Sequence, residues 1–175
     1  PLYLRALSIE EKTLGPDHPD TASILKGLAS IYHIQGIFNK AEPLYLRALS
    51  IEEKTLGPDH PFTSQTVGAL ASLYKDQEKY SKAEPLYLRA LSNDEKTLGP
   101  NHPATAVSIN NLATFYNSKG LYSKAESLYL RALSILERTT LGSDNIFIDR
   151  SLINLALNYS SQGLYEKAIP LMFRA

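Results

Sequence analysis

The stretch PLYLRALSIEEKTLGPDHP occupies residues 1–19 and recurs without a change at residues 43–61. A third copy at residues 85–103 differs at Asn93, Asp94 and Asn101, and a fourth begins at residue 127 as SLYLRALSILERTTLG. A fifth begins at residue 170 as PLMFRA. A regular repeat of about 20 to 50 residues is typical of an array in which each unit packs on its neighbours. The sequence therefore predicts a repeat protein.

Each repeat is predicted to form two antiparallel helices. In residues 20–61, apolar and small side chains recur at helical spacing in two runs. The first run contains Leu25, Leu28, Ala29 and Tyr32, and the second contains Ala41, Leu44, Tyr45, Ala48 and Leu49. Gly36 separates the runs, Gly57 follows the second, and Pro61 opens the next repeat. We therefore expect an all-α structure, with helices near residues 2–14, 20–35, 38–56, 62–77, 80–98, 104–119, 122–140, 147–162 and 164–175.

The small and aromatic positions of this unit resemble those of the tetratricopeptide repeat. The matching residues are Leu28, Ala29, Tyr32, Gly36, Phe38, Ala41 and Ala48. The period of 42 residues (from residue 1 to residue 43) and the LGPDHP connector are similar to the kinesin-light-chain type of this repeat. The resemblance implies a right-handed superhelical solenoid formed by one array over residues 1–175. Its full repeats would be 20–61, 62–103 and 104–145, and its partial repeats 1–19 and 146–175. Because both ends of the sequence fall inside repeats, we interpret it as a fragment of a longer chain.

The connector after the fourth copy departs from the pattern. LERTTLGSDNIF has one residue more than EEKTLGPDHPF and lacks both prolines. One residue inserted into a helix would rotate everything after it by about 100°. The helical spacing nevertheless resumes at Leu152, Leu155 and Tyr159. We therefore expect an irregular connector near Thr139–Thr140 that absorbs the extra residue.

Composition argues against several classes of partner. The chain has 18 basic and 18 acidic side chains, so its net charge of zero gives no electrostatic reason to expect nucleic acid or an anionic membrane. It has no cysteine, which excludes disulfides and thiolate metal sites. No signal peptide or membrane-spanning run is present in the sequence given. We expect a cytoplasmic protein without a cofactor.

Divergence between repeats is concentrated in the first helix of each pair. The second helices are near-copies, whereas the first helices share little beyond their packing positions. In tetratricopeptide arrays the first helices line a concave groove, so the resemblance implies a binding surface for a protein or an extended peptide. The predicted groove residues are Lys26, Ser30, His33, Gln65, Ser72, Lys75, Asn110, Asn111, Thr114, Asn117, Arg150 and Asn154. Two alternatives remain: free drift of exposed positions, and a structural spacer or self-association module within a larger protein.

Two asparagines are singled out by the resemblance. Kinesin-light-chain grooves often carry an asparagine just before the Leu-Ala pair, where it can bond the backbone of an extended peptide. Asn111 in NNLA and Asn154 in INLA match that position, whereas Gly27 and Ala69 do not. The resemblance therefore places the peptide-holding function in the C-terminal half. The two-carboxylate clamp of chaperone-binding arrays cannot be assembled from this sequence.

Other recurring residues have structural explanations. His18, His60 and His102 recur in DHP or NHP triplets, where capping of the next helix explains them better than metal binding. We expect the arginines at 5, 47, 89, 131 and 174 to pair with glutamates, and the tyrosines at 3, 45, 87 and 129 to lie in the core. No phosphate loop, nucleophile elbow or pair of catalytic carboxylates is present, so we do not expect an enzyme.

The two ends of the sequence are expected to be partly uncovered. The residues concerned are Leu2, Tyr3, Leu4 and Leu7 at one end, and Leu171, Met172 and Phe173 at the other. Because each end mimics the repeat that the other lacks, end-to-end self-association is a further prediction.

Overall fold

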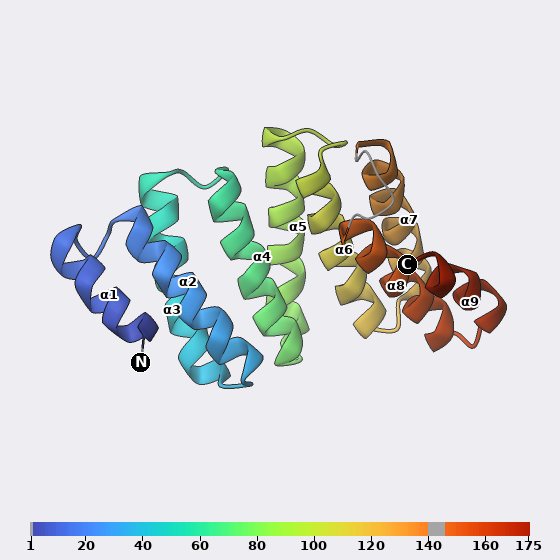
Figure 1. Cartoon of the computed structure of the whole chain (residues 1–175), viewed down its shortest axis with the longest axis horizontal. Coiled ribbons are helices and arrows are strands. Elements are labelled where there is room, and N and C mark those ends of the chain that lie inside the picture. The colour runs from blue at the N-terminus through green and yellow to red at the C-terminus, as the bar shows by residue number, and fades with distance from the viewer. Residues whose placement is uncertain (1, 140–145) are drawn as a thin grey trace. The chain divides into compact units, whose positions relative to one another are not determined.

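A computed structural model describes residues 2–139 and 146–175. Within those ranges the chain forms nine α-helices and no strand (Figure 1). They are α1 (Leu2–Thr13), α2 (Pro19–Ile34), α3 (Phe38–Thr55), α4 (Pro61–Asp76), α5 (Tyr80–Thr97), α6 (Pro103–Ser118), α7 (Tyr122–Thr139), α8 (Ile146–Ser161) and α9 (Tyr165–Arg174). The all-α prediction is confirmed, and each helix begins and ends within one residue of its predicted bounds. The irregular connector predicted at Thr139–Thr140 falls largely outside the described residues.

The chain divides into two compact units, residues 1–93 (unit 1) and residues 94–175 (unit 2). In unit 1, α2 packs against α1 and α3, and α3 packs against α4. In unit 2, α6 packs against α7, α7 against α8, and α8 against α9. The first helices of neighbouring repeats also contact each other, α2 with α4 and α6 with α8. Each unit is therefore built from helix pairs whose first helices lie side by side (Figure 1).

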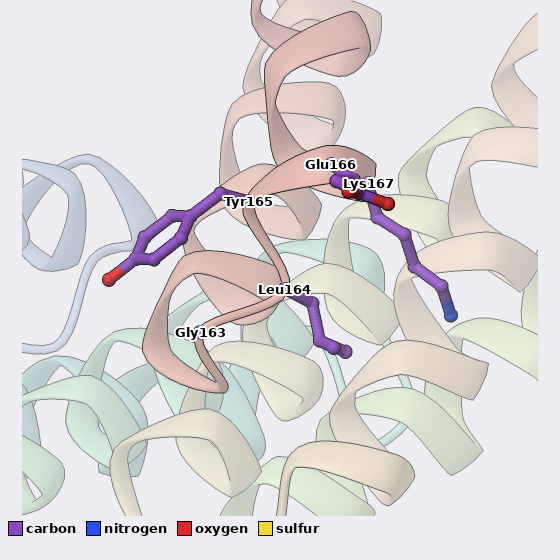
Figure 2. Close-up of a pocket in the computed structure, with 5 residues that line it drawn as sticks. All are labelled: Gly163, Leu164, Tyr165, Glu166 and Lys167. Atoms are coloured by element: carbon purple, nitrogen blue, oxygen red, sulfur yellow. The ribbon is translucent and has the colours of Figure 1, made fainter.

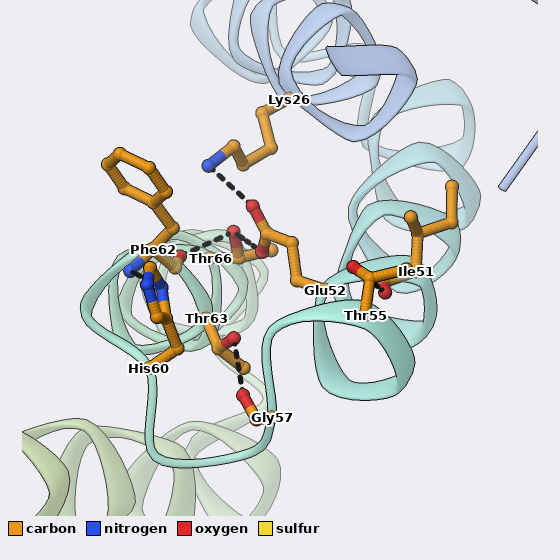
Figure 3. Close-up of polar contacts among 9 residues, drawn as sticks. All are labelled: Lys26, Ile51, Glu52, Thr55, Gly57, His60, Phe62, Thr63 and Thr66. Atoms are coloured by element: carbon orange, nitrogen blue, oxygen red, sulfur yellow. Dashed lines mark hydrogen bonds and ion pairs between the residues drawn. The ribbon is translucent and has the colours of Figure 1, made fainter. Parts of the chain in front are cut away.

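The connector before each first helix is held by its own side chains. Nδ1 of His60 accepts a hydrogen bond from the backbone N–H of Phe62 at 3.2 Å, and Pro61 occupies the first turn (Figure 3). The hydroxyl of Thr63 donates to the carbonyl of Gly57 at 2.8 Å, which ties the helix start to the end of the preceding helix. His18 with Thr21 and His102 with Thr105 repeat both bonds. The capping role predicted for these histidines is confirmed.

Small side chains let the paired helices approach closely. The alanines at the predicted close contacts are almost fully buried, at 0–2% exposure: Ala29, Ala41, Ala48, Ala71, Ala83, Ala90, Ala113, Ala125 and Ala132. Tyr45, Tyr87 and Tyr129 are buried as predicted, but Tyr3 is 44% exposed, so its assignment to the core is wrong. Tyr3 has no first helix before it in this sequence and lies against Gly27, where an added Cβ would be 2.5 Å from its ring.

The second helices are linked along the array by ion pairs. Arginine and glutamate side chains 36 or 37 residues apart pair as Arg47–Glu11, Arg89–Glu53, Arg131–Glu95 and Arg174–Glu137. The predicted arginine–glutamate pairing is confirmed at these four positions. All of these groups are at least one-third exposed, so each pair contributes little to stability.

The predicted uncovered ends are found as well. Leu2, Tyr3, Leu4, Met172 and Phe173 are between 44% and 89% exposed. Leu7 and Leu171 are half-buried. None of the helices in the described ranges is both long and apolar enough to cross a membrane.

Candidate functional site

In each unit the first helices present one strip of accessible side chains at helical spacing, which we call the open face. In unit 1 its members are Ser23 and Ser30 of α2 and Phe62, Gln65 and Ser72 of α4. In unit 2 they are Val107, Asn111 and Thr114 of α6 and Phe147, Arg150, Asn154 and Leu157 of α8. All are exposed or half-buried. Because α2 contacts α4 and α6 contacts α8, each unit's open face spans two neighbouring repeats.

Some predicted groove residues of unit 1 instead contact a neighbouring helix. Nζ of Lys26 lies 2.7 Å from Oε1 of Glu52, a carboxylate side chain only 3% exposed, and the Thr66 hydroxyl donates to the other oxygen of Glu52 at 2.5 Å (Figure 3). Nε2 of His33 lies 2.7 Å from Oδ2 of Asp76, whose Oδ1 is 3.0 Å from Nζ of Lys75. His33 therefore joins consecutive repeats directly, and Lys26 does so through Glu52 and Thr66, so both are less available to a ligand than predicted.

The same arrangement recurs in unit 2 with neutral groups. The amide nitrogen of Asn110 donates to the Ser151 hydroxyl at 2.6 Å, and that of Asn158 donates to Oδ1 of Asn117 at 2.9 Å. Asn110 is 2% exposed, so its predicted place in an open groove is wrong. Its side chain holds α6 against α8 instead.

Three hydroxyl groups of the open face are bonded to the buried tyrosine of their own repeat. The Tyr129 hydroxyl donates to Oγ1 of Thr114 at 3.0 Å. Burial raises the pKa of Tyr129, and the Thr114 hydrogen bond opposes that rise. The pairs Tyr45 with Ser30 and Tyr87 with Ser72 follow the same rule: burial raises the tyrosine pKa and the serine hydrogen bond opposes it. These hydroxyl groups therefore also stabilise the fold, because each one gives a buried tyrosine its hydrogen-bond partner.

Four predicted residues are accessible and without a hydrogen bond or ion pair to any residue in the described ranges: Gln65, Asn111, Arg150 and Asn154. Asn111 and Asn154 occupy equivalent positions on the two contacting helices of unit 2, as the matching NNLA and INLA segments show. In unit 1 the corresponding positions are Gly27 and Ala69, which carry no polar side chain. Two free amides on contacting helices are therefore found on the unit 2 open face, whereas the unit 1 open face carries the single free amide of Gln65.

Two aromatic members of the open face were missed by sequence analysis. Phe62 is 54% exposed and Phe147 is 41% exposed, at equivalent positions in the first turn of α4 and α8. A cation lies over each ring, with Nζ of Lys26 5.5 Å from the Phe62 centroid and Cζ of Arg150 5.4 Å from that of Phe147. The sequence did offer a signal for these two residues. Both are large and apolar and follow the connector, at a position where the other repeats have Asp20 or Ala104.

A pocket of about 350 Å³ lies at the turn between α8 and α9 (Figure 2). It is lined by residues 163–167, none of which belongs to the open face. Within the described residues, no group of three histidine, cysteine, aspartate or glutamate side chains could hold a metal ion.

Comparisons with known proteins agree with this architecture. The tetratricopeptide repeat family matches residues 1–51, 28–96, 67–138 and 105–175. BtubC (BKLC) from P. vanneervenii is 28% identical with a TM-score of 0.79, over 99% of this chain and 68% of that chain. A putative kinesin light chain with nearly identical TPR-like repeats from Podosopora anserina is 26% identical with a TM-score of 0.73. The match covers 99% of this chain and 82% of that chain. A Rap protein complexed with Competence and Sporulation Factor shares the fold, with a TM-score of 0.77 at 20% identity. The match covers 89% of this chain and 42% of that chain. No curated protein matches the sequence.

Proposed function

The chain belongs to the tetratricopeptide repeat family, and on that premise we propose that it is a non-catalytic scaffold that binds an extended segment of another protein on its open face. Stacked helix-pair repeats bind partners on the extended surfaces that stacking creates. The unit 2 open face carries most of the binding in this proposal, because two free amides, Asn111 and Asn154, lie there on contacting helices.

The observation that carries the proposal is the pair Asn111 and Asn154. A primary amide offers two N–H donors and a carbonyl acceptor, which complement the C=O and N–H of a peptide group. An extended peptide leaves these backbone groups unpaired along its length, so two amides on neighbouring helices can bond it at two points. Neither amide bonds another described residue, so no internal hydrogen bond has to break when a ligand arrives. Backbone recognition of this kind does not depend on the ligand's side chains.

The test begins with linear random peptides displayed on phage and selected on the native chain. Binding of the selected peptides is then measured by fluorescence anisotropy against the native chain and the double variant Asn111→Ala/Asn154→Ala. Each lost hydrogen bond contributes about 0.5–1.5 kcal/mol, so affinity should fall on the order of 10-fold for the pair.

The matched control is Asn39→Ala, which removes an exposed amide from the second helix α3. This control should bind the selected peptides as the native chain does. Neither variant should melt below the native chain, because the amides that were removed make no internal bonds and alanine is the better helix former. Selected peptides that bind the double variant as tightly as the native chain would refute this assignment.

A further inference from the structure

A buried carboxylate joins neighbouring repeats in both units, but the two sites differ in charge. In unit 1 the carboxylate is Glu52, which receives Nζ of Lys26 on one oxygen at 2.7 Å and the Thr66 hydroxyl on the other (Figure 3). In unit 2 it is Asp94 of α5, which is 6% exposed and accepts a hydrogen bond from the Ser108 hydroxyl of α6 at 2.5 Å. Glu52 and Asp94 occupy equivalent positions of the repeat, and so do Thr66 and Ser108.

Asp94 lacks the cation that Glu52 has. The residue equivalent to Lys26 is Gly68, which has no side chain. Among the described residues, Ser108 is the only one that forms a hydrogen bond or an ion pair with Asp94. That link between helices does not require a charge, because a neutral amide would accept the same hydrogen bond at a smaller cost of burial.

The following repeat has lost both charges. The residues equivalent to Lys26 and Glu52 are there Asn110 and Leu136, and both are fully buried. A buried charge is costly unless a charge of opposite sign pairs with it. A carboxylate that is kept where the internal cation is missing therefore points to a cation from outside the chain.

Asp94 lies beneath the open face of unit 2. Its partner Ser108 is half-buried, and Asn111 follows Ser108 by three residues, so the two are neighbours on one side of α6. A peptide backbone bonded to Asn111 therefore passes within about one helical turn of the Ser108–Asp94 pair. A long side chain of that peptide can meet the carboxylate from the first helix, as Lys26 of α2 meets Glu52 in unit 1.

We propose that Asp94 is a specificity-determining residue, which binds the ammonium group of one lysine side chain of the peptide. This inference rests on the proposed function and adds the chemistry of the ligand to it. Lysine fits better than arginine, because the Ser108 hydrogen bond occupies one carboxylate oxygen and leaves the other for a point charge. A guanidinium binds a carboxylate best through both oxygens.

The test uses the peptides selected on the native chain and two variants that each remove one negative charge. Asp94→Asn keeps an oxygen that accepts from Ser108, so it should retain the fold, which a thermal melt checks. Glu166→Gln is the matched control, because it changes an exposed carboxylate on α9 of the same unit. Each lysine of each selected peptide is changed in turn to methionine and to arginine, and all pairs are measured by fluorescence anisotropy.

One lysine of each peptide should stand out. Its change to methionine should weaken binding to the native chain and to Glu166→Gln on the order of 10-fold or more, as expected for a lost hydrogen bond between charged groups. Its change to arginine should weaken binding to both by a smaller factor. On Asp94→Asn the methionine change should cost less than about 2-fold, because the lysine and Asp94 are energetically coupled.

The outcomes separate the two claims. Peptides that lose affinity for Asn111→Ala/Asn154→Ala but show the same lysine penalty on Asp94→Asn and on the native chain would overturn the lysine assignment and leave the proposed function standing. The peptide changes on the native chain need no protein variant, so the lack of a single sensitive lysine would overturn the assignment whatever the stability of Asp94→Asn. Peptides that bind independently of the two asparagines, or a selection that yields none, would overturn both claims.

Discussion

Glu78 occupies a backbone position that the other repeats give to glycine. Its φ is 58°, and the equivalent residues Gly36, Gly120 and Gly163 have φ of 71°, 71° and 74°. The hydrogen bonds that close the helix are the same at all four sites; here the N–H of Glu78 donates to Lys75 and that of Lys79 donates to Tyr74. Glu78 is therefore held in the left-handed conformation by the same cap that elsewhere ends on glycine. We predict that Glu78→Gly stabilises the protein.

The magnitude follows from two opposing terms. A residue with a Cβ pays about 1–2 kcal/mol in the left-handed region, and this cost disappears with glycine. Glycine in turn loses about 0.5–1 kcal/mol more conformational entropy on folding. The Glu78 side chain is exposed and forms no hydrogen bond or ion pair with a described residue, so its removal adds no further term. The expected net gain is about 0.5–1 kcal/mol, a rise of roughly 1–4 °C in melting temperature for a chain of this size.

The assay is urea unfolding followed by circular dichroism, with thermal melts in parallel. Glu78→Ala is the control, because it removes the carboxylate and keeps the Cβ, so it should gain little. Gly120→Ala, the reverse change in unit 2, should lose a similar amount. If Glu78→Ala were as stable as Glu78→Gly, the effect would come from the charge and the backbone argument would fail.

Three further changes probe the fold. Ala83→Leu should cost about 1–3 kcal/mol, since Ala83 is 0% exposed at a close helix contact, and an unchanged urea midpoint would contradict that packing. Burial first, and then the hydrogen bond and charge of Glu42, raise the pKa of Tyr74 to about 12. In the unfolded chain the Tyr74 hydroxyl ionises near pH 10, so its contribution to the free energy of unfolding is complete below about pH 10 and is lost as pH rises through about 12. Tyr74→Phe should therefore lose less stability over this range, as measured by urea unfolding at each pH. Lys26→Asn leaves the Glu52 charge buried without its cation and should cost about 3 kcal/mol, whereas Lys26→Asn/Glu52→Leu should recover most of it; equal unfolding free energies for the single and double variants would refute this.

The fold could be predicted because its signals are local. The Gly57-Pro58 connector and Pro61 mark where one helix ends and the next begins, and the alanines show which face packs closely. The cap formed by His60 also follows from its place beside Pro61. Repeat equivalence alone places Tyr3 in the core, whereas its place at the predicted uncovered end agrees with its 44% exposure.

The site could be predicted less completely, for a geometric reason. Adjacent residues of a helix point about 100° apart, so Asn110 and Asn111 face different surroundings although the sequence makes them alike. One is 2% exposed and bonded to Ser151, and the other is exposed and free of described partners. Helical spacing selects the side of the helix away from its own core, but it does not separate the edge that meets the next first helix from the face that meets a ligand.

That distinction changes what divergence between repeats means. In unit 1 the charged pair Lys26 and Glu52 is completed by Thr66, and in unit 2 the equivalent residues are Asn110, Leu136 and Ser151. Removing one member of a buried ion pair costs more than replacing both, so the change of glutamate to leucine and the change of lysine to asparagine suit each other. Divergence at these two sites therefore records the mutual adjustment of packed neighbours, and it carries no information about a ligand. The remaining variation, at Asn111 and Asn154, introduces amides that make no hydrogen bond or ion pair with a described residue, and that is why the proposed binding surface rests on those two amides.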